Sequence, residues 1–240
     1  MEILVVTRFS FHGQSGWKSE FSTDPEKLFE RERLEARLLL MRVINLSSLK
    51  AQTNQNFHHY ILTSADLPEW ALNGLTEACI ATYGSPDRFS IRAEPFGKAR
   101  ARLARFLVER YGAEPVAQVV LDDDDGLSAA FMADLAERLT RIEGDVAKGE
   151  RTLPYFISYP NGLGVTFDET GVALYRHRYE FINLGLTMIS RPREKNVFSI
   201  DHQSTPKRFG CEVVETELMF LRSVHGFNDS RVGVTRRWVR

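Results

Sequence analysis

Four consecutive aspartates, Asp122, Asp123, Asp124 and Asp125, directly follow a short apolar run at residues 115–121. A run of this length that is rich in β-branched residues is typical of a buried central strand in a parallel sheet. The glycine and serine at 126 and 128 then favour the end of that strand and the start of an amphipathic helix at 128–142. The four carboxylates are therefore predicted to lie at the carboxyl edge of a sheet, where open α/β folds bind their ligands.

The charge of this aspartate run has two interpretations. Four adjacent like charges repel one another, and at such an edge they persist most easily with a divalent cation between them. The alternative is a plain acidic turn, because acidic runs commonly lie in solvated loops or disordered tails. The run is short, and a predicted strand and helix flank it without a linker. A metal-binding or ligand-binding role is the favoured interpretation.

Strand-like and helix-like segments alternate along the first 145 residues. Short apolar runs predict strands, and apolar residues at helical spacing predict helices between them. The predicted strands are 3–6, 57–63, 89–94 and 115–121, and the predicted helices are 31–50, 68–83, 98–111 and 128–142. Such alternation implies right-handed crossovers and a mostly parallel sheet with helices on both faces, which is an α/β, Rossmann-like fold class.

The pattern changes after about residue 145. Residues 155–159 and 171–175 are predicted to form two antiparallel strands around a Pro-Asn-Gly turn region. A short strand follows at 184–189, and 215–224 has helical spacing. We expect an α/β part at 1–145 and a smaller α+β part at 146–240, packed as a single unit.

Composition excludes several classes of protein. The formal net charge is −1, so the overall charge does not indicate a nucleic-acid partner or an anionic membrane. The two cysteines, Cys79 and Cys211, lack metal-type spacing and are expected to be free thiols in a reducing compartment. No stretch reaches transmembrane length. We expect a cytoplasmic protein without a transmembrane segment.

Three common motifs are absent from the sequence: Gly-x-Gly-x-x-Gly after the first strand, the P-loop Gly-x-x-x-x-Gly-Lys-Ser/Thr, and the Gly-x-Ser-x-Gly elbow. Their absence disfavours a dinucleotide oxidoreductase, a P-loop kinase and an α/β hydrolase. What remains is a nucleotide-type sheet with Asp-x-Asp at a strand end. Such carboxylates hold Mg²⁺ or Mn²⁺, and the metal in turn holds a diphosphate.

Four stretches of the chain resemble a known family. They are Thr7-Arg8-Phe9-Ser10, residues 46–53 with Phe57 and Ile61-Leu62, residues 121–127 around the aspartate run, and Val224-His225-Gly226-Phe227-Asn228. Together they resemble the bacterial rhamnosyltransferase family, whose members are glycosyltransferases of the GT-A fold. The resemblance spans nearly the whole chain. It implies a hexosyltransferase, expected to be inverting, that moves a sugar from a dTDP- or UDP-sugar to a saccharide or lipid-linked acceptor.

The resemblance also implies a role for each residue of the run. Asp122 would face the ribose or base end of the donor nucleotide. Asp124 would ligate the divalent cation, Mg²⁺ or Mn²⁺, with Asp125 supporting it directly or through water. Asp123 fits a variable middle position, from which its carboxylate would add negative electrostatic potential at the substrate.

Residues outside the run complete the implied site. Arg8 would contact the donor's base or diphosphate, although a surface salt bridge is the plain alternative for it. His225 is the first choice for a histidine on the metal or diphosphate, and His202 is the second. His225 could instead cap the end of the predicted helix at 215–224.

An inverting transferase needs a carboxylate that takes the proton of the acceptor hydroxyl. Spacing does not choose among Glu180, Asp201, Glu215 and Asp229. Asp201 and Asp229 are preferred because they lie beside the two candidate histidines. Two other functions stay open: a metal-dependent nucleotidyltransferase or phosphotransferase that uses the same carboxylates, and a non-catalytic sugar-nucleotide-binding protein.

Overall fold

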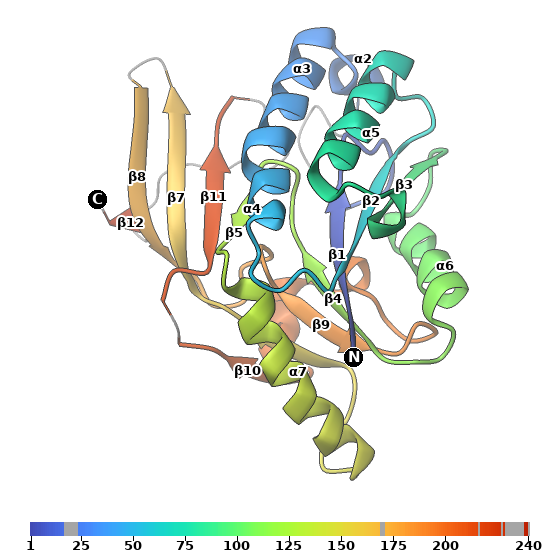
Figure 1. Cartoon of the computed structure of the whole chain (residues 1–240), viewed down its shortest axis with the longest axis vertical. Coiled ribbons are helices and arrows are strands. Elements are labelled where there is room, and N and C mark those ends of the chain that lie inside the picture. Colours follow the sequence, from blue (N-terminus) through green and yellow to red (C-terminus); the bar gives the residue numbers. More distant parts are fainter. Residues whose placement is uncertain (17–23, 169–170, 216, 227, 229–237, 240) are drawn as a thin grey trace.

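The described strands form two β-sheets, a larger one among the helices and a smaller one that reaches the left edge in Figure 1. The computed structural model describes residues 1–16, 24–168, 171–215, 217–226, 228 and 238–239. The larger sheet has seven strands in the order β10-β6-β9-β4-β1-β2-β3. Their bounds are β1 Glu2–Arg8, β2 His58–Ser64, β3 Phe89–Glu94, β4 Val116–Val120, β6 Tyr155–Ser158, β9 Thr187–Ser190 and β10 Gly210–Val213.

The larger sheet is mostly parallel. β4, β1, β2 and β3 pair in parallel, and only β9 runs antiparallel to its two neighbours, β4 and β6. The predicted α/β class, a mostly parallel sheet flanked by helices, is confirmed. Strands β6, β9 and β10 all come from residues 146–240, so this part of the chain extends the same sheet.

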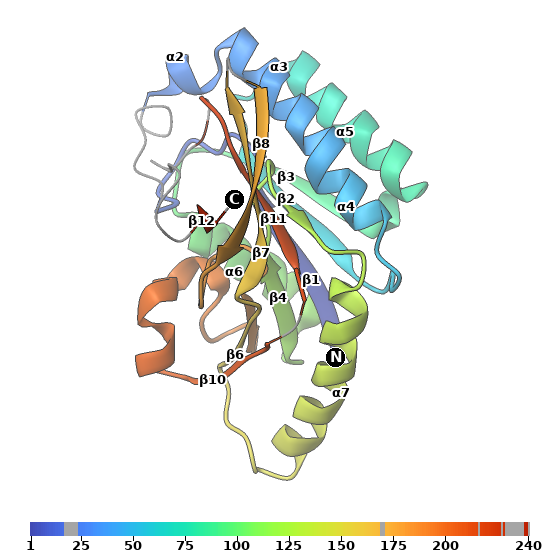
Figure 2. The same cartoon turned by 90° about the vertical axis from the view of Figure 1, so that its left-hand side faces the viewer.

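Helices cover both faces of the larger sheet (Figure 2). The α-helices are α2 Pro25–Leu28, α3 Arg31–Leu40, α4 Ser47–Lys50, α5 Glu69–Tyr83, α6 Ala99–Tyr111 and α7 Phe131–Ala147. A π-helix, η1 Met41–Leu46, joins α3 to α4, and the 3-10 helices are η2 Pro86–Arg88, η3 Val197–Ser199 and η4 His202–Lys207.

The alternation of side chains along β1 divides the core into layers. Ile3 and Val5 pack with α7, whereas Leu4 and Val6 pack with α6. A third cluster places α3 and α5 against β2, through residues such as Ile61. The two faces of one central strand are therefore both buried, which explains its continuous apolar sequence.

The long helix predicted at 31–50 is present, but its middle is π-helical. The segment Met41–Leu46 interrupts the α-helical pattern between α3 and α4. π-turns inside helices are rare and frequently mark functional sites. As a consequence Asn45 is fully buried, while Ile44 is only half-buried.

The second sheet has five strands in the order β12-β8-β7-β11-β5. Their bounds are β5 Gly126–Leu127, β7 Asn161–Asp168, β8 Gly171–Arg178, β11 Phe220–Val224 and β12 Trp238–Val239. β11 pairs in parallel with β7 and antiparallel with β5, which directly follows the aspartate run. A Cβ on Gly162 would lie 2.3 Å from the ring of Phe220, so the β7–β11 contact requires a glycine there. The second sheet thereby brings β11 beside the four aspartates.

Three predictions for secondary structure were wrong. Residues 155–159 pair with β9 and not with 171–175, because β7 begins at Asn161 and takes β8 as its partner. Residues 220–224 form strand β11 and not a helix, because β5 and β7 supply hydrogen-bonding partners on both sides. The helix expected from 128 begins at Phe131, because Gly126–Leu127 are used as strand β5.

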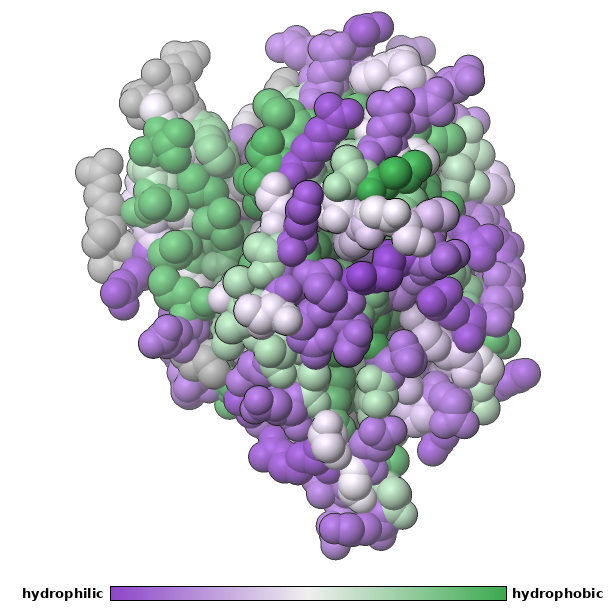
Figure 3. All heavy atoms as spheres, viewed as in Figure 1, coloured by the Kyte–Doolittle hydropathy of each residue, from purple (hydrophilic) through white to green (hydrophobic). Residues whose placement is uncertain are grey.

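Apolar side chains are exposed on the hairpin of β7 and β8 (Figure 3). They include Val172 and Leu174, which are 68% and 57% exposed, and Phe167. Among the described residues no helix is long and apolar enough to cross a membrane.

Candidate functional site

A pocket of about 680 Å³ lies at the carboxyl ends of β1 and β4. Three of the four aspartates, Asp122, Asp124 and Asp125, line this pocket. The other lining residues are Arg8, Gln14, Ser15, Gly16, Arg37, Lys98, Arg100, Asn183, Val197, Phe198, Ser199, Ile200, Asp201, His202, Arg222, Ser223 and Asn228. The structure thus brings the predicted strand-end carboxylates and the 197–202 segment to one pocket.

Pairing between β1 and β4 fixes the position of the aspartate run. The paired register continues to Val6 and Val120, and the Leu121 amide then donates to the Val6 carbonyl at 3.1 Å. Beyond this point the Asp125 amide donates to the Asp122 carbonyl at 3.2 Å, so the run forms a turn. Parallel neighbours end together at this edge of the sheet, which leaves the turn open to a ligand.

Arg8, at the end of β1, lies in the pocket beside Asp122. Its Nη2 is 3.4 Å from Asp122 Oδ1, and its Nη1 donates to the Ser15 carbonyl at 2.5 Å. The guanidinium also lies 4.9 Å from the centre of the Phe198 ring. Arg8 is 5% exposed and is not a surface salt-bridge partner.

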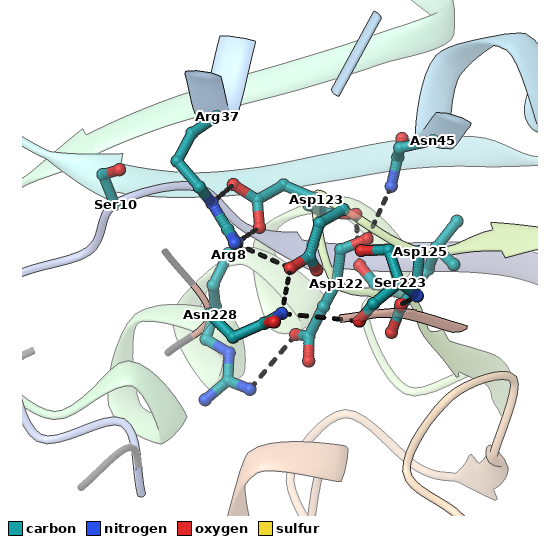
Figure 4. A network of polar contacts seen from close by, with 12 residues as sticks. Arg8, Ser10, Arg37, Asn45, Asp122, Asp123, Asp125, Ser223 and Asn228 are labelled. Carbon is teal, nitrogen blue, oxygen red and sulfur yellow. Dashed lines mark hydrogen bonds and ion pairs between the residues drawn. The ribbon is translucent and has the colours of Figure 1, made fainter. Parts of the chain in front are cut away.

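Arg37 of α3 binds two neighbouring aspartates from beneath the pocket (Figure 4). Its Nε donates to Asp123 Oδ2 at 3.1 Å, its Nη2 donates to Asp123 Oδ1, and its Nη1 donates to Asp124 Oδ2 at 2.7 Å. Asp123 is fully buried. The structure therefore places Asp123 against α3 and not on the pocket wall, where the sequence prediction expected it to face substrate.

Asp124 contacts three side chains, those of Arg37, His225 and Asn228. Besides Arg37, its Oδ2 contacts His225 Nε2 at 3.0 Å and accepts from Asn228 Nδ2 at 2.8 Å. Burial by itself would raise the pKa of the Asp124 carboxyl, but Arg37 and His225 outweigh burial and hold that pKa below its usual range. Asp124 is therefore a fixed carboxylate at neutral pH.

Asp125, the last residue of the run, contacts strand β11. Its Oδ1 accepts from the backbone amide of Ser223 at 2.9 Å (Figure 4). Burial, followed by the charges of Asp124 and Asp122, raises the pKa of the Asp125 carboxyl well above its usual range. The Asp125 carboxyl therefore takes up a proton more readily than an ordinary aspartate does.

His225 follows strand β11 and does not end a helix. Its backbone amide donates to Asn228 Oδ1 at 2.6 Å, which forms a short turn that rests on Asp124. His225 therefore lies beside Asp124, as the sequence predicted. Its helix-capping alternative is wrong, because no helix is present at 215–224 within the described residues.

The segment from Val197 to His202 forms another part of the pocket wall. His202 Nδ1 lies 2.6 Å from the Phe181 carbonyl, which can only accept, so Nδ1 carries the proton and Nε2 is the basic nitrogen. Asp201 is exposed and caps η4 by accepting from the Gln203 amide at 3.2 Å. The other base candidate, Asp229, lies outside the described residues.

Cations also line the pocket. Lys98 and Arg100, at the start of α6, have no carboxylate partner among the described residues. Within the same residues, no group of three His, Cys, Asp or Glu side chains is arranged to hold a metal ion. The pocket therefore joins a buried acidic centre to a basic edge.

Two of the site residues, Arg37 and Asn45, were missed by sequence reasoning, and Asn228 was noted within the stretch 224–228 but given no role. Arg37 had a detectable signal, because it lies three residues after Leu34 and four before Met41, on the apolar stripe of the helix. A charged residue at such a position means either that the helix is wrongly assigned or that the charge is buried with a partner of opposite charge.

The sequence of this chain matches a known protein family. The sequence matches the family described as "Putative rhamnosyl transferase" over residues 2–237. The chain belongs to this family. The resemblance stated from the sequence is therefore confirmed. No curated protein matches the chain significantly in sequence.

Solved structures of two kinds resemble this member of the family. S. aureus TarS 1–349 in complex with UDP-GlcNAc has a TM-score of 0.48 and 11% identity, covering 98% of this chain and 62% of that one. A UDP-glucose pyrophosphorylase complexed with UDP-glucose has a TM-score of 0.33 and 13% identity, covering 80% of this chain and 75% of that one. The chain thus spans less than two thirds of the TarS structure.

Proposed function

We propose that the protein is a metal-dependent glycosyltransferase that moves a hexose, rhamnose in the first instance, from a dTDP- or UDP-sugar to a saccharide or lipid-linked acceptor. The observation that carries the proposal is one pocket that joins three carboxylates of the aspartate run to the basic residues Lys98 and Arg100. Membership of the rhamnosyl transferase family supports the reaction class.

The charges of the pocket suit the donor. A nucleoside diphosphate is a polyanion with a neutral sugar at one end, and it needs cations along the phosphates. Arg8, Lys98 and Arg100 supply such cations from the ends of two different elements. Asp122, whose side chain is 31% exposed beside Arg8, is available to accept hydrogen bonds from ribose hydroxyls.

The residues fit a divalent cation that is shared with the donor. His225 Nε2 and Asp124 Oδ2 lie 3.0 Å apart at the pocket, so both side chains would hold one divalent cation there. Burial, and then the charges of Asp124 and Asp122, raises the pKa of Asp125, and a bound cation would favour its ionised form. Mg²⁺ commonly takes one or two protein carboxylates and completes its shell with substrate phosphates. Asp124, Asp125 and His225 are the proposed ligands, and the incomplete protein set is consistent with a metal that arrives with the diphosphate.

The proposed reaction is a displacement at the anomeric carbon of the sugar. The bond from that carbon to the diphosphate oxygen breaks, a bond to the acceptor oxygen forms, and the acceptor proton passes to a base of the enzyme. When bound, the metal neutralises the charge that develops on the leaving diphosphate. Asp201 and Asp229 remain the proposed base candidates, and inversion at the anomeric carbon follows from a single displacement.

His202 is a substrate-binding candidate on the same wall. Its Nδ1–H is fixed on the Phe181 carbonyl, so its Nε2 can accept a hydrogen bond from a donor or acceptor hydroxyl. A fixed tautomer restricts the hydroxyls that the ring can bind.

A thermal-shift screen tests the proposal. Each sugar nucleotide is added with Mn²⁺, with Mg²⁺ and with EDTA. Ligand at about 100 times its Kd stabilises the native state by about 2.7 kcal/mol, which is roughly 5–10 °C for a chain of this size. A shift with a dTDP- or UDP-sugar only when metal is present supports the transferase. Shifts with nucleoside triphosphates alone favour the nucleotidyltransferase, and binding of a sugar nucleotide without turnover favours a binding protein.

A further inference from the structure

Arg37 occupies a position that helical spacing assigns to the core. It shares one face of the helix with Leu34, Leu38 and Met41, all of which are buried, and Arg37 itself is 1% exposed. An uncompensated guanidinium in such a place would lose much of its hydration free energy. The position is therefore stable only with a fixed anionic partner.

Two carboxylates of the aspartate run supply that partner. Arg37 binds both oxygens of Asp123 and one oxygen of Asp124. A planar guanidinium that is bound through three nitrogens fixes the orientation of its partners as well as attracting them. The backbone between these two aspartates cannot rotate without breaking one of the contacts.

A second contact from the same helix holds the start of the run. Asn45 Nδ2 donates to the Asp122 carbonyl at 3.0 Å (Figure 4). Asn45 lies eight residues after Arg37, and in a regular α-helix the two side chains would point about 80° apart. The π-helical segment Met41–Leu46 has more residues per turn, and it turns Asn45 toward the face that carries Arg37.

We infer that residues 31–50 act as a clamp on the aspartate run, in which Arg37 is a positioning residue that holds Asp124 toward His225 and the pocket. This inference deepens the proposed function and rests on it, because it says how the fold keeps the acidic centre in place before metal and donor arrive. Arg37 acts through Asp123 and Asp124 and transfers no proton or group.

The test separates positioning from simple burial of charge. The double variant Arg37→Met with Asp123→Leu removes both charges of the buried pair at similar volume, an exchange that is often neutral or stabilising for folding. It also removes the contact from Arg37 to Asp124. Arg37→Lys is the second variant, because it keeps the charge and loses the three-nitrogen geometry. Arg138→Lys is the matched control, because Arg138 forms a comparable two-nitrogen pair with Asp134 on α7, outside the pocket lining.

Two readouts are used. The first is the side-chain ¹⁵N resonance of His225, assigned with His225→Gln, which reports the contact with Asp124 without any ligand. The second is Mn²⁺-dependent affinity for UDP by calorimetry. The clamp predicts a shifted His225 resonance and affinity weakened by roughly 10- to 100-fold in both Arg37 variants, even where the melting temperature is retained.

The control variant should leave both readouts unchanged. An unshifted His225 resonance and parental affinity in a folded Arg37 variant would overturn the clamp and leave Arg37 as a structural counter-ion. If the parent protein itself binds no nucleoside diphosphate with metal, the proposed function fails. The His225 resonance then decides the clamp alone: a shift supports it and no shift overturns it.

Discussion

Replacing Asp123 with asparagine should destabilise the protein far more than the same change at Asp122. Asp123 is fully buried and is bound at both oxygens by Arg37. Removing one partner of a buried ion pair typically costs 3–5 kcal/mol. Arg37 keeps its contact with Asp124, and the asparagine oxygen still accepts one hydrogen bond, so we expect the lower end of this range, about 3 kcal/mol.

Asp122→Asn is the matched comparison. Its side chain is 31% exposed and lies 3.4 Å from Arg8, so the charge contact is weaker and is screened by solvent. We expect a loss below about 1 kcal/mol for Asp122→Asn. Urea unfolding followed by circular dichroism measures both free energies. In a thermal scan Asp123→Asn should melt roughly 6–12 °C below the parent.

Equal losses at the two positions would refute this reasoning, since they would show that the buried pair with Arg37 contributes no more than the partly exposed pair of Asp122 and Arg8. A loss at Asp123 within about 0.5 kcal/mol of zero would have the same meaning. Unfolding at two salt concentrations adds a further check, because a buried pair should respond little to ionic strength.

Three further changes have defined outcomes. Asp124→Asn should abolish metal-dependent donor binding in calorimetry, because it removes the proposed ligand beside His225; parental binding would place the metal elsewhere. Burial, and then the charge of His58, lowers the pKa of His59 to about 3. Below about pH 6.5 the unfolded chain therefore binds one more proton than the native state. The free energy of unfolding should decrease as the pH is lowered. Between pH 7.0 and 5.5 the parent should lose roughly 1.3 kcal/mol more than His59→Gln in urea unfolding, and equal slopes would contradict the buried neutral ring. Gly162→Ala should cost about 1–3 kcal/mol, because its Cβ would overlap the Phe220 ring, and it should also weaken donor binding by displacing β11; a parental melting temperature would show that the two strands separate easily.

Local periodicity predicted most strands and helices of the first 145 residues, but not the π-helical segment Met41–Leu46 or strand β5. The strand at 89–94 and the helix at 98–111 were placed within a residue, because each has an unbroken pattern and a clear end such as Gly112. The later strands were harder, because strand pairing depends on segments far apart in sequence. Residues 215–224 carry leucines at helical spacing, yet β5 and β7 provide the backbone partners that decide for a strand.

The acidic centre was predictable for a simple reason. Parallel strands end at one edge of the sheet, so carboxylates after β4 must lie near the end of β1, where Arg8 is found. Asp123 was misplaced because sequence alone treats neighbouring aspartates alike, whereas the turn directs one of them toward Arg37. The burial of Asn45 depends on the π-turn, which no residue pattern in the helix indicated.

Analysis of the reaction products tests the central claim most directly. The protein is incubated with Mn²⁺ or Mg²⁺, a panel of dTDP- and UDP-sugars, and saccharide and lipid-linked acceptors, and the nucleotide products are separated and weighed by mass spectrometry. A glycosyltransferase predicts nucleoside diphosphate in equal amount to glycosylated acceptor, with both lost in EDTA and in Asp124→Asn. Release of pyrophosphate or phosphate instead of nucleoside diphosphate would contradict the account and identify chemistry at phosphorus.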